Sequence, residues 1–152
     1  MKISDYLKKD HCVMELKAEN KEEAIKEIVY RLQSSEKILH QEEFIKDILE
    51  REDLGSTGIG YGVAIPHART KAVKDFVIGF GKSLSGIEFN ALDGQKVNLI
   101  FLMGANLQKL NLYLRLLAEL SKLLMNELVR KELLSANECI EIIEVIKKFE
   151  IT

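Results

Sequence analysis

The chain has 152 residues, of which 47% are hydrophobic and 30% are charged, and its formal net charge is −2. That length suggests one domain, over 1–152, with a core large enough to fold without a metal or a disulfide. The near-neutral charge gives no support to a nucleic-acid partner, and no apolar run approaches the ~20 residues of a membrane-spanning helix. Residues 1–11 lack the apolar segment of a signal peptide, so we expect a cytoplasmic protein without direct membrane insertion.

The first third of the chain predicts a strand and two amphipathic helices. A single helical turn is expected over 4–7, and a strand over 12–16. Asn20 is a favourable helix N-cap, and apolar residues then recur at helical spacing to about residue 34. A second helix is expected over 41–51, where the apolar side chains again fall on one face.

Strands dominate the middle of the chain. Short apolar runs predict strands over 63–66, 76–80 and 85–89. The strongest candidate is 97–103, which is apolar on both faces apart from Asn98. That pattern is typical of a central strand covered by helices on both sides.

Two helices are expected to complete the chain. The first covers about 108–125, and the second starts at Asn137 as its cap. The leucines that step along the first helix are Leu110, Leu114, Leu117, Leu120 and Leu124. The residues expected on one side of the second are Cys139, Ile140, Ile143 and Ile146. The order of elements describes one α/β layered domain.

The cysteines and two of the histidines have simple interpretations. Cys12 and Cys139 lie far apart and form no CxxC pair, so we expect buried or inert free thiols. The three histidines lack the spacing of metal ligands, so no metal site is expected. His11 and His40 are expected on the surface, at element boundaries.

The stretch 51–67, with the sequence REDLGSTGIGYGVAIPH, holds the best candidates for function. It contains four of the nine glycines, and a glycine-rich loop can leave backbone N–H groups pointing at an anion. Pro66 is the only proline and biases Ile65 toward an extended conformation. We therefore expect the strand over 63–66 to deliver His67 at its end.

These residue types suit phosphoryl transfer. A neutral imidazole such as that of His67 is a nucleophile near neutral pH, and the reaction otherwise needs positioning and donors to the equatorial oxygens. Arg51 could supply a bidentate cation. The other candidate donors are the backbone N–H groups of Ser56, Thr57, Gly58, Ile59 and Gly60. The pattern also allows a glycine-rich turn without a ligand, and an Arg51 that only complements a helix C-terminus.

The run from Arg51 to Gly60, followed by GVAIPHA at 62–68, resembles the active-site signature of enzyme IIA components of the bacterial phosphoenolpyruvate-dependent phosphotransferase system. The similarity is to the fructose/mannitol class, which includes the nitrogen-type regulatory IIA proteins. It implies a single-domain layered sandwich, with a mixed central sheet of about five strands flanked by helices, and no cofactor. It also implies that His67 is phosphorylated and that Arg51, sixteen residues upstream, helps to bind the phosphoryl group.

The long helix departs from the pattern of that family. Members usually carry a second histidine at its start, in a pattern like H-L-x-L-L-x-x-L-x-x-L-L, and Tyr113 stands at this position here. A tyrosine hydroxyl can donate one hydrogen bond but is not cationic at neutral pH. Tyr113 is therefore expected either to contact the phosphoryl group without charge assistance or simply to pack within the helix layer.

The resemblance implies a phosphoryl carrier that accepts phosphate on His67 from the histidine-containing phosphocarrier protein and passes it to a IIB component. The alternative is a nitrogen-type regulatory IIA protein whose phosphorylation state controls binding to partner proteins. A free-standing chain and the Ser-Thr-Gly-Ile-Gly form of the loop favour this alternative. A third possibility is a domain that binds partners without being phosphorylated, which the loss of the second histidine permits.

Overall fold

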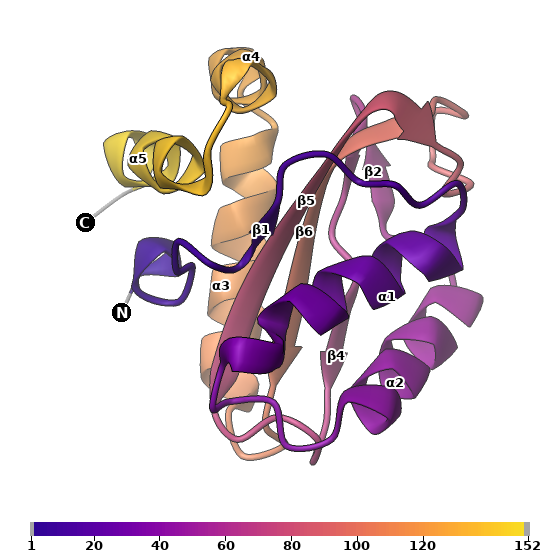
Figure 1. The fold of residues 1–152 in the computed structure, drawn as a ribbon, viewed down its shortest axis with the longest axis vertical. Coiled ribbons are helices and arrows are strands. Elements are labelled where there is room, and N and C mark those ends of the chain that lie inside the picture. The colour runs from indigo at the N-terminus through magenta and orange to yellow at the C-terminus, as the bar shows by residue number, and fades with distance from the viewer. Residues whose placement is uncertain (1, 151–152) are drawn as a thin grey trace.

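A mixed sheet of six strands separates two layers of helices in the computed structural model, which describes residues 2–150 (Figure 1). Helices α1 (Lys21–Arg31) and α2 (Gln41–Asp53) cover one face of the sheet. Helix α3 (Leu110–Leu124) covers the other face, with α4 (Glu127–Ser135) and α5 (Cys139–Phe149) beside it. The expected α/β layered sandwich with a mixed sheet is confirmed. Within residues 2–150, no helix has the length and apolar character needed to cross a bilayer.

The sheet is built around one long antiparallel pair. The strands are β1 (Cys12–Val13), β2 (Gly58–Gly60), β3 (Val63–Ala64), β4 (His67–Arg69), β5 (Phe76–Ile87) and β6 (Val97–Ala105). Their order is β1-β5-β6-β3-β2, and β4 also pairs with β6. Strands β3 and β4 both run parallel to β6, one after the other. The central position expected for 97–103 is thus confirmed.

Alternate residues of β6 enter two separate cores. Leu99, Phe101 and Met103 belong to the core under α3, α4 and α5. Ile100 and Leu102 belong to the core under α1 and α2. Because side chains of a strand alternate between its faces, a strand covered on both sides is expected to be apolar on both, as this one is apart from Asn98.

Helix α1 approaches β5 closely because two residues of the strand lack side chains. A Cβ atom added at Gly81 would lie 2.7 Å from Ile28 Cδ1, and one at Gly79 would lie 2.9 Å from Ile28 Cγ2. Alanine at either position would therefore force the Ile28 side chain of α1 to move.

Several element boundaries differ from the prediction. The strand expected over 12–16 is limited to β1, and the first helical turn is the 3₁₀ turn η1 (Ile3–Asp5). The strands expected over 76–80 and 85–89 form one strand, β5, because pairing with β6 continues through Lys82 opposite Leu99. Helix α1 ends at Arg31 and continues as the 3₁₀ turn η2 (Leu32–Ser34).

The C-terminal helices differ more. Helix α4 was not predicted, although Asn126 caps it by accepting a hydrogen bond from Leu128 N at 2.9 Å. The N-cap of α5 is Glu138 rather than Asn137. The leucine stripe expected on α3 is partly wrong, since Leu110 and Leu114 are 41% and 53% exposed. The residues of α3 that are buried are Tyr113, Leu116, Leu120 and Leu124.

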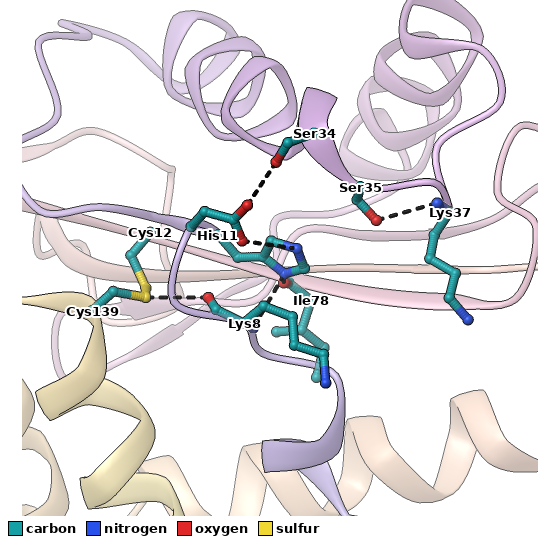
Figure 2. A network of polar contacts seen from close by, with 9 residues as sticks. Lys8, His11, Cys12, Ser34, Ser35, Lys37, Ile78 and Cys139 are labelled. Carbon is teal, nitrogen blue, oxygen red and sulfur yellow. Dashed lines mark hydrogen bonds and ion pairs between the residues drawn. A yellow bond between two sulfur atoms is a disulfide. The ribbon is translucent and has the colours of Figure 1, made fainter.

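The two cysteines form a disulfide, so the prediction of free thiols is wrong (Figure 2). Cys12 lies in β1 and Cys139 is the first residue of α5, and their Cα atoms are 5.5 Å apart. The pair is separated by 127 positions in the sequence. Only the packing of the last helix beside the edge strand brings them together, which spacing in the sequence does not reveal.

His11 is buried rather than on the surface. It is 5% exposed, and its Nδ1 lies 3.0 Å from the Ile78 carbonyl oxygen (Figure 2). Its place directly before β1 explains the burial, because the η1 segment folds over this edge of the sheet. His40 is exposed at the start of α2, as expected.

Candidate active site

His67 was expected at the end of the strand that precedes it, but it is the first residue of a separate strand, β4. Strand β3 ends at Ala64, and Ile65 and Pro66 lie between the two strands. Proline cannot donate to a strand ladder, so the ladder is interrupted there. The Pro66 carbonyl still accepts a hydrogen bond from Met103 N at 2.9 Å, which keeps His67 aligned with β6.

The imidazole of His67 is held in one tautomer. The ring is 8% exposed, and Nδ1 lies 2.7 Å from the Ile65 carbonyl oxygen. Because a carbonyl oxygen can only accept, Nδ1 carries the proton and Nε2 keeps its lone pair.

Burial lowers the pKa of His67 below its ordinary value, and the positive charge of Arg51 acts in the same direction. The hydrogen bond to Ile65 and the charge of Glu52 oppose this shift without reversing it. The ring is therefore neutral at pH 7, the state that a nucleophile needs.

His67 lies on the wall of a cleft of about 800 Å³ between α2, β4 and the start of α3. Arg51 and Tyr113 line the same cleft, so the structure brings these three candidates together. Exposed leucines form part of the lining: Leu54, Leu107 and Leu110. Carboxylates from α2 also contribute, and one of them, Asp47, accepts a hydrogen bond from the Thr70 hydroxyl.

Tyr113 lies directly beside the histidine. The ring centroids of His67 and Tyr113 are 5.7 Å apart, with an edge-on interplanar angle of 64°. Tyr113 is 9% exposed, and burial raises the pKa of its hydroxyl. The hydroxyl therefore stays protonated at neutral pH and can donate a hydrogen bond to a group in the cleft.

Arg51 belongs both to its helix and to the cleft. It lies in the last turn of α2, where a cation complements the helix C-terminus. Its Nη1 donates a hydrogen bond to the Gly55 carbonyl oxygen at 2.8 Å. Since a guanidinium has five N–H donors, this bond leaves others for a ligand in the cleft.

The loop 56–60 is placed differently from what had been expected. Among the residues that the structure describes, none of Ser56, Thr57, Gly58, Ile59 and Gly60 lines the cleft. Thr57 N donates to Glu52 Oε1 at 3.2 Å, and Gly58 N donates to Ser56 Oγ at 3.0 Å. These two N–H groups are therefore not free to bind an anion. Positive φ angles at Gly60 (101°) and Gly62 (77°) serve the tight turn between β2 and β3.

Arg69 is a cleft residue that the sequence interpretation missed. It lines the cleft, and its Nη1 donates to the Leu107 carbonyl oxygen at 3.2 Å. The signal was its position, because residues two apart in a strand lie on the same face and Arg69 follows His67 by two. Arg69 thus adds a second guanidinium to the side of the cleft that holds His67.

Comparison with known proteins gives this geometry a context. The sequence model of the family described as "Phosphoenolpyruvate-dependent sugar phosphotransferase system, EIIA 2" matches residues 5–149. The fructose-specific EIIABC component of the phosphotransferase system of Bacillus subtilis (strain 168) is 39% identical over 150 residues. That alignment covers 99% of this chain and 24% of the relative, so the chain spans about a quarter of its length.

Two solved structures share the fold. The nitrogen regulatory protein IIA-Ntr from Neisseria meningitidis superposes with a TM-score of 0.87 at 28% identity, covering 95% of this chain and 98% of that one. The IIA mannitol chain in its complex with phosphorylated IIB mannitol from Escherichia coli gives a TM-score of 0.78 at 22% identity. This second match covers 93% of this chain and 97% of the other, and it shows the fold alone.

Proposed function

The chain belongs to the EIIA 2 family of the phosphoenolpyruvate-dependent sugar phosphotransferase system, and we propose that it carries the phosphoryl group on Nε2 of His67. One observation carries this proposal. The Ile65 carbonyl oxygen, 2.7 Å from Nδ1, holds the proton on that nitrogen and leaves the lone pair on Nε2. Burial keeps the ring neutral by lowering its pKa, so the lone pair is available at pH 7.

The proposed transfer begins at the phosphohistidine of the histidine-containing phosphocarrier protein. The Nε2 lone pair of His67 attacks phosphorus, and the bond between phosphorus and the donor's ring nitrogen breaks. The electron pair of that bond returns to the donor. The Nδ1–H of His67 stays hydrogen-bonded to Ile65, which stabilises the positive charge that develops on the ring as Nε2 forms its bond.

Arg51 and Tyr113 are the proposed ligands of the phosphoryl oxygens. Both line the cleft beside His67, and the Tyr113 ring contacts the imidazole edge-on. Arg51 contributes charge, and Tyr113 contributes a neutral hydrogen bond where other family members usually have a histidine. The loop 56–60 has a supporting role in this proposal and does not donate directly to the phosphoryl group.

The proposed acceptor is a IIB component, and the exchange takes place in the cytoplasm. The fold shared with a IIA chain that forms a complex with phosphorylated IIB is compatible with a IIB partner. The exposed Leu54, Leu107 and Leu110 around the cleft offer apolar contact area to a partner that must bring its own ring to His67.

A regulatory role is the second candidate, and the similarity to the Neisseria IIA-Ntr structure favours it. Phosphorylation would add nearly two negative charges at the cleft and so change the affinity for a partner protein. Binding assays with the phosphorylated and unphosphorylated chain separate the two roles. A carrier passes its label to a IIB protein, whereas a regulator binds a kinase or transporter in one state only.

The experiment that tests the proposal is phosphoryl uptake from labelled phosphoenolpyruvate in the presence of enzyme I and the phosphocarrier protein. The parent chain is expected to acquire acid-labile, base-stable label. His67→Ala is expected to acquire none, while His40→Ala, a change at the exposed start of α2, labels like the parent. Equal labelling of His67→Ala and the parent would overturn the proposal.

A further inference from the structure

A buried carboxylate lies behind the cleft, next to Arg51 in the sequence. The side chain of Glu52 is 2% exposed, and its Oε1 is 3.0 Å from Lys21 Nζ. The same oxygen accepts a hydrogen bond from Thr57 N at 3.2 Å, and Oε2 accepts one from the Thr57 hydroxyl. Burying a charge is costly unless it is paired and hydrogen-bonded, and Glu52 meets both conditions.

Thr57 continues the connection from Glu52 to His67. The Thr57 carbonyl oxygen accepts a hydrogen bond from Ile65 N at 3.1 Å. The Ile65 carbonyl oxygen in turn accepts the hydrogen bond from His67 Nδ1 at 2.7 Å. A continuous series of hydrogen bonds therefore runs from the buried carboxylate to the imidazole.

Lys21 fixes the same loop from α1, of which it is the first residue. Besides its ion pair with Glu52, its ammonium lies 5.2 Å from the centroid of the Phe89 ring. The Phe89 carbonyl oxygen accepts a hydrogen bond from the Ser56 hydroxyl. One lysine thus holds both groups that anchor the loop, the Glu52 carboxylate and the Phe89 segment.

We propose that Glu52 is a positioning residue for phosphoryl transfer, which through Thr57 and Ile65 holds the His67 ring so that Nε2 faces the cleft. Glu52 does not line the cleft itself, so it acts through these residues and does not touch the phosphoryl group. The inference rests on the proposed role of His67 as the phosphoryl acceptor. The negative charge of Glu52 has a second effect. It raises the pKa of His67, whereas burial and the charge of Arg51 lower it.

Glu52→Gln tests the proposal, because it keeps the shape and one acceptor oxygen but removes the charge. We expect kcat for phosphoryl uptake to fall about tenfold, since small misplacements of a reacting group are costly. KM for the phosphocarrier protein should stay unchanged, because the carboxylate is outside the contact surface. The pKa of His67, measured by NMR titration of the imidazole, should fall. The matched control is Asp53→Asn, an exposed neighbour on the same helix, which should change none of these.

A second pair of variants changes Thr57 and keeps the ion pair between Lys21 and Glu52. These variants test the proposal even if Glu52→Gln does not fold. Thr57→Ala removes the hydroxyl donor to the carboxylate and is expected to lower kcat, whereas Thr57→Ser keeps that donor and should retain most of the rate.

A folded Glu52→Gln variant with the parent kcat and the parent titration would overturn the proposal. If Glu52→Gln does not fold, a parent kcat in Thr57→Ala would overturn it. If the parent chain takes up no phosphate, the proposed function fails, and the titration alone still decides whether Glu52 acts on His67.

Discussion

Two buried histidines, His11 and His67, are alike in most local respects. They are 5% and 8% exposed, and each ring has its Nδ1 within 3.0 Å of a backbone carbonyl oxygen. Burial is the main cause that lowers the pKa of both. Each is therefore a neutral imidazole at pH 7, and these properties alone do not separate a structural histidine from a chemical one.

The charged neighbours of the two rings differ. His11 Nε2 lies 3.8 Å from Asp10 Oδ1, and Asp10 also accepts a hydrogen bond from the Ser34 hydroxyl at 2.8 Å (Figure 2). Lys37, on a neighbouring loop, is paired with Asp75 at 2.7 Å, and the one cation that contributes to the lowered pKa of His11 is Lys8. His67 instead shares its cleft with the guanidinium groups of Arg51 and Arg69, although carboxylates of α2 line the cleft as well. A carboxylate beside Nε2 repels an incoming phosphoryl group, whereas guanidinium groups attract it, so the neighbours favour the role that we propose for His67.

The largest expected effect separates the two histidines directly. His67→Gln should reduce the rate of phosphoryl uptake on the order of a thousandfold or more, because the nucleophile is lost. His11→Gln should leave that rate within about twofold of the parent, since its amide can still donate to the Ile78 carbonyl. Rapid-quench labelling measures the uptake rate of both variants. Similar rate losses in the two would contradict a chemical role for His67 that His11 lacks.

The disulfide, which lies near His11, should stabilise the folded chain without affecting phosphoryl transfer at His67. Cys139→Ser should lower the free energy of unfolding by about 4 kcal/mol, because the bond closes a loop of more than a hundred residues in the unfolded chain. Denaturant unfolding with and without reductant is the measurement, and phosphoryl uptake should stay at the parent rate. Identical midpoints for the parent chain in both conditions would show that the bond does not form.

Arg51 is expected to account for much of the rate of phosphoryl uptake at His67. Arg51→Ala should slow uptake about a hundredfold, in the range found when one preorganised donor to a transition state is removed. Arg31→Ala removes an equally charged, exposed residue from the last turn of α1 and serves as the control. A rate loss no larger than that of the control would mean that Arg51 only caps its helix and loop.

Tyr113 should have a smaller effect. Tyr113→Phe removes one neutral donor and should slow uptake about fivefold, in line with the net contribution of an uncharged hydrogen bond. Tyr113→His adds a group that can become cationic and is expected to raise the rate above that of the parent. An unchanged rate in both variants would assign Tyr113 to packing alone.

The smallest effect concerns pH and applies to both histidines. Their pKa values are lowered in the folded state, so below the usual histidine value of about 6.5 the unfolded chain binds more protons than the folded one. Stability should therefore fall as pH drops from that value through the folded pKa values. Thermal unfolding of the His11→Gln/His67→Gln variant should depend less on pH in this window. An equal dependence of stability on pH in the parent and the double variant would contradict the lowered pKa values of the two histidines.

Local signals in the sequence predicted much of the fold. Asn20 does cap α1, accepting a hydrogen bond from Glu23 N at 2.9 Å, and the apolar spacing after it gives the buried face of that helix. The apolar run at 97–103 predicted that this strand, β6, lies at the centre of the sheet. Features that depend on pairing between distant segments were not predictable in this way. These include the merging of two expected strands into β5 and the disulfide.

The candidate site was predicted unevenly for a related reason. Residue type already made Arg51 a candidate partner of His67, resemblance to a known signature added Tyr113, and the structure brings these side chains into one cleft. The glycine-rich pattern suggested that the loop N–H groups bind an anion, but Thr57 N and Gly58 N donate to Glu52 and Ser56 instead. Glu52 was not predicted because its two partners, Lys21 and Thr57, come from separate segments that only the folded chain brings together.

The most direct test of this account is the position of the phosphorus–nitrogen bond. The chain, labelled with ¹⁵N in its histidines and phosphorylated by enzyme I and the phosphocarrier protein, would be studied by ¹⁵N and ³¹P NMR. The account predicts coupling of phosphorus to Nε2 of His67, with Nδ1 still protonated against the Ile65 carbonyl and the His11 signals unchanged. A phosphoryl group on Nδ1 of His67, or on His11, would contradict it.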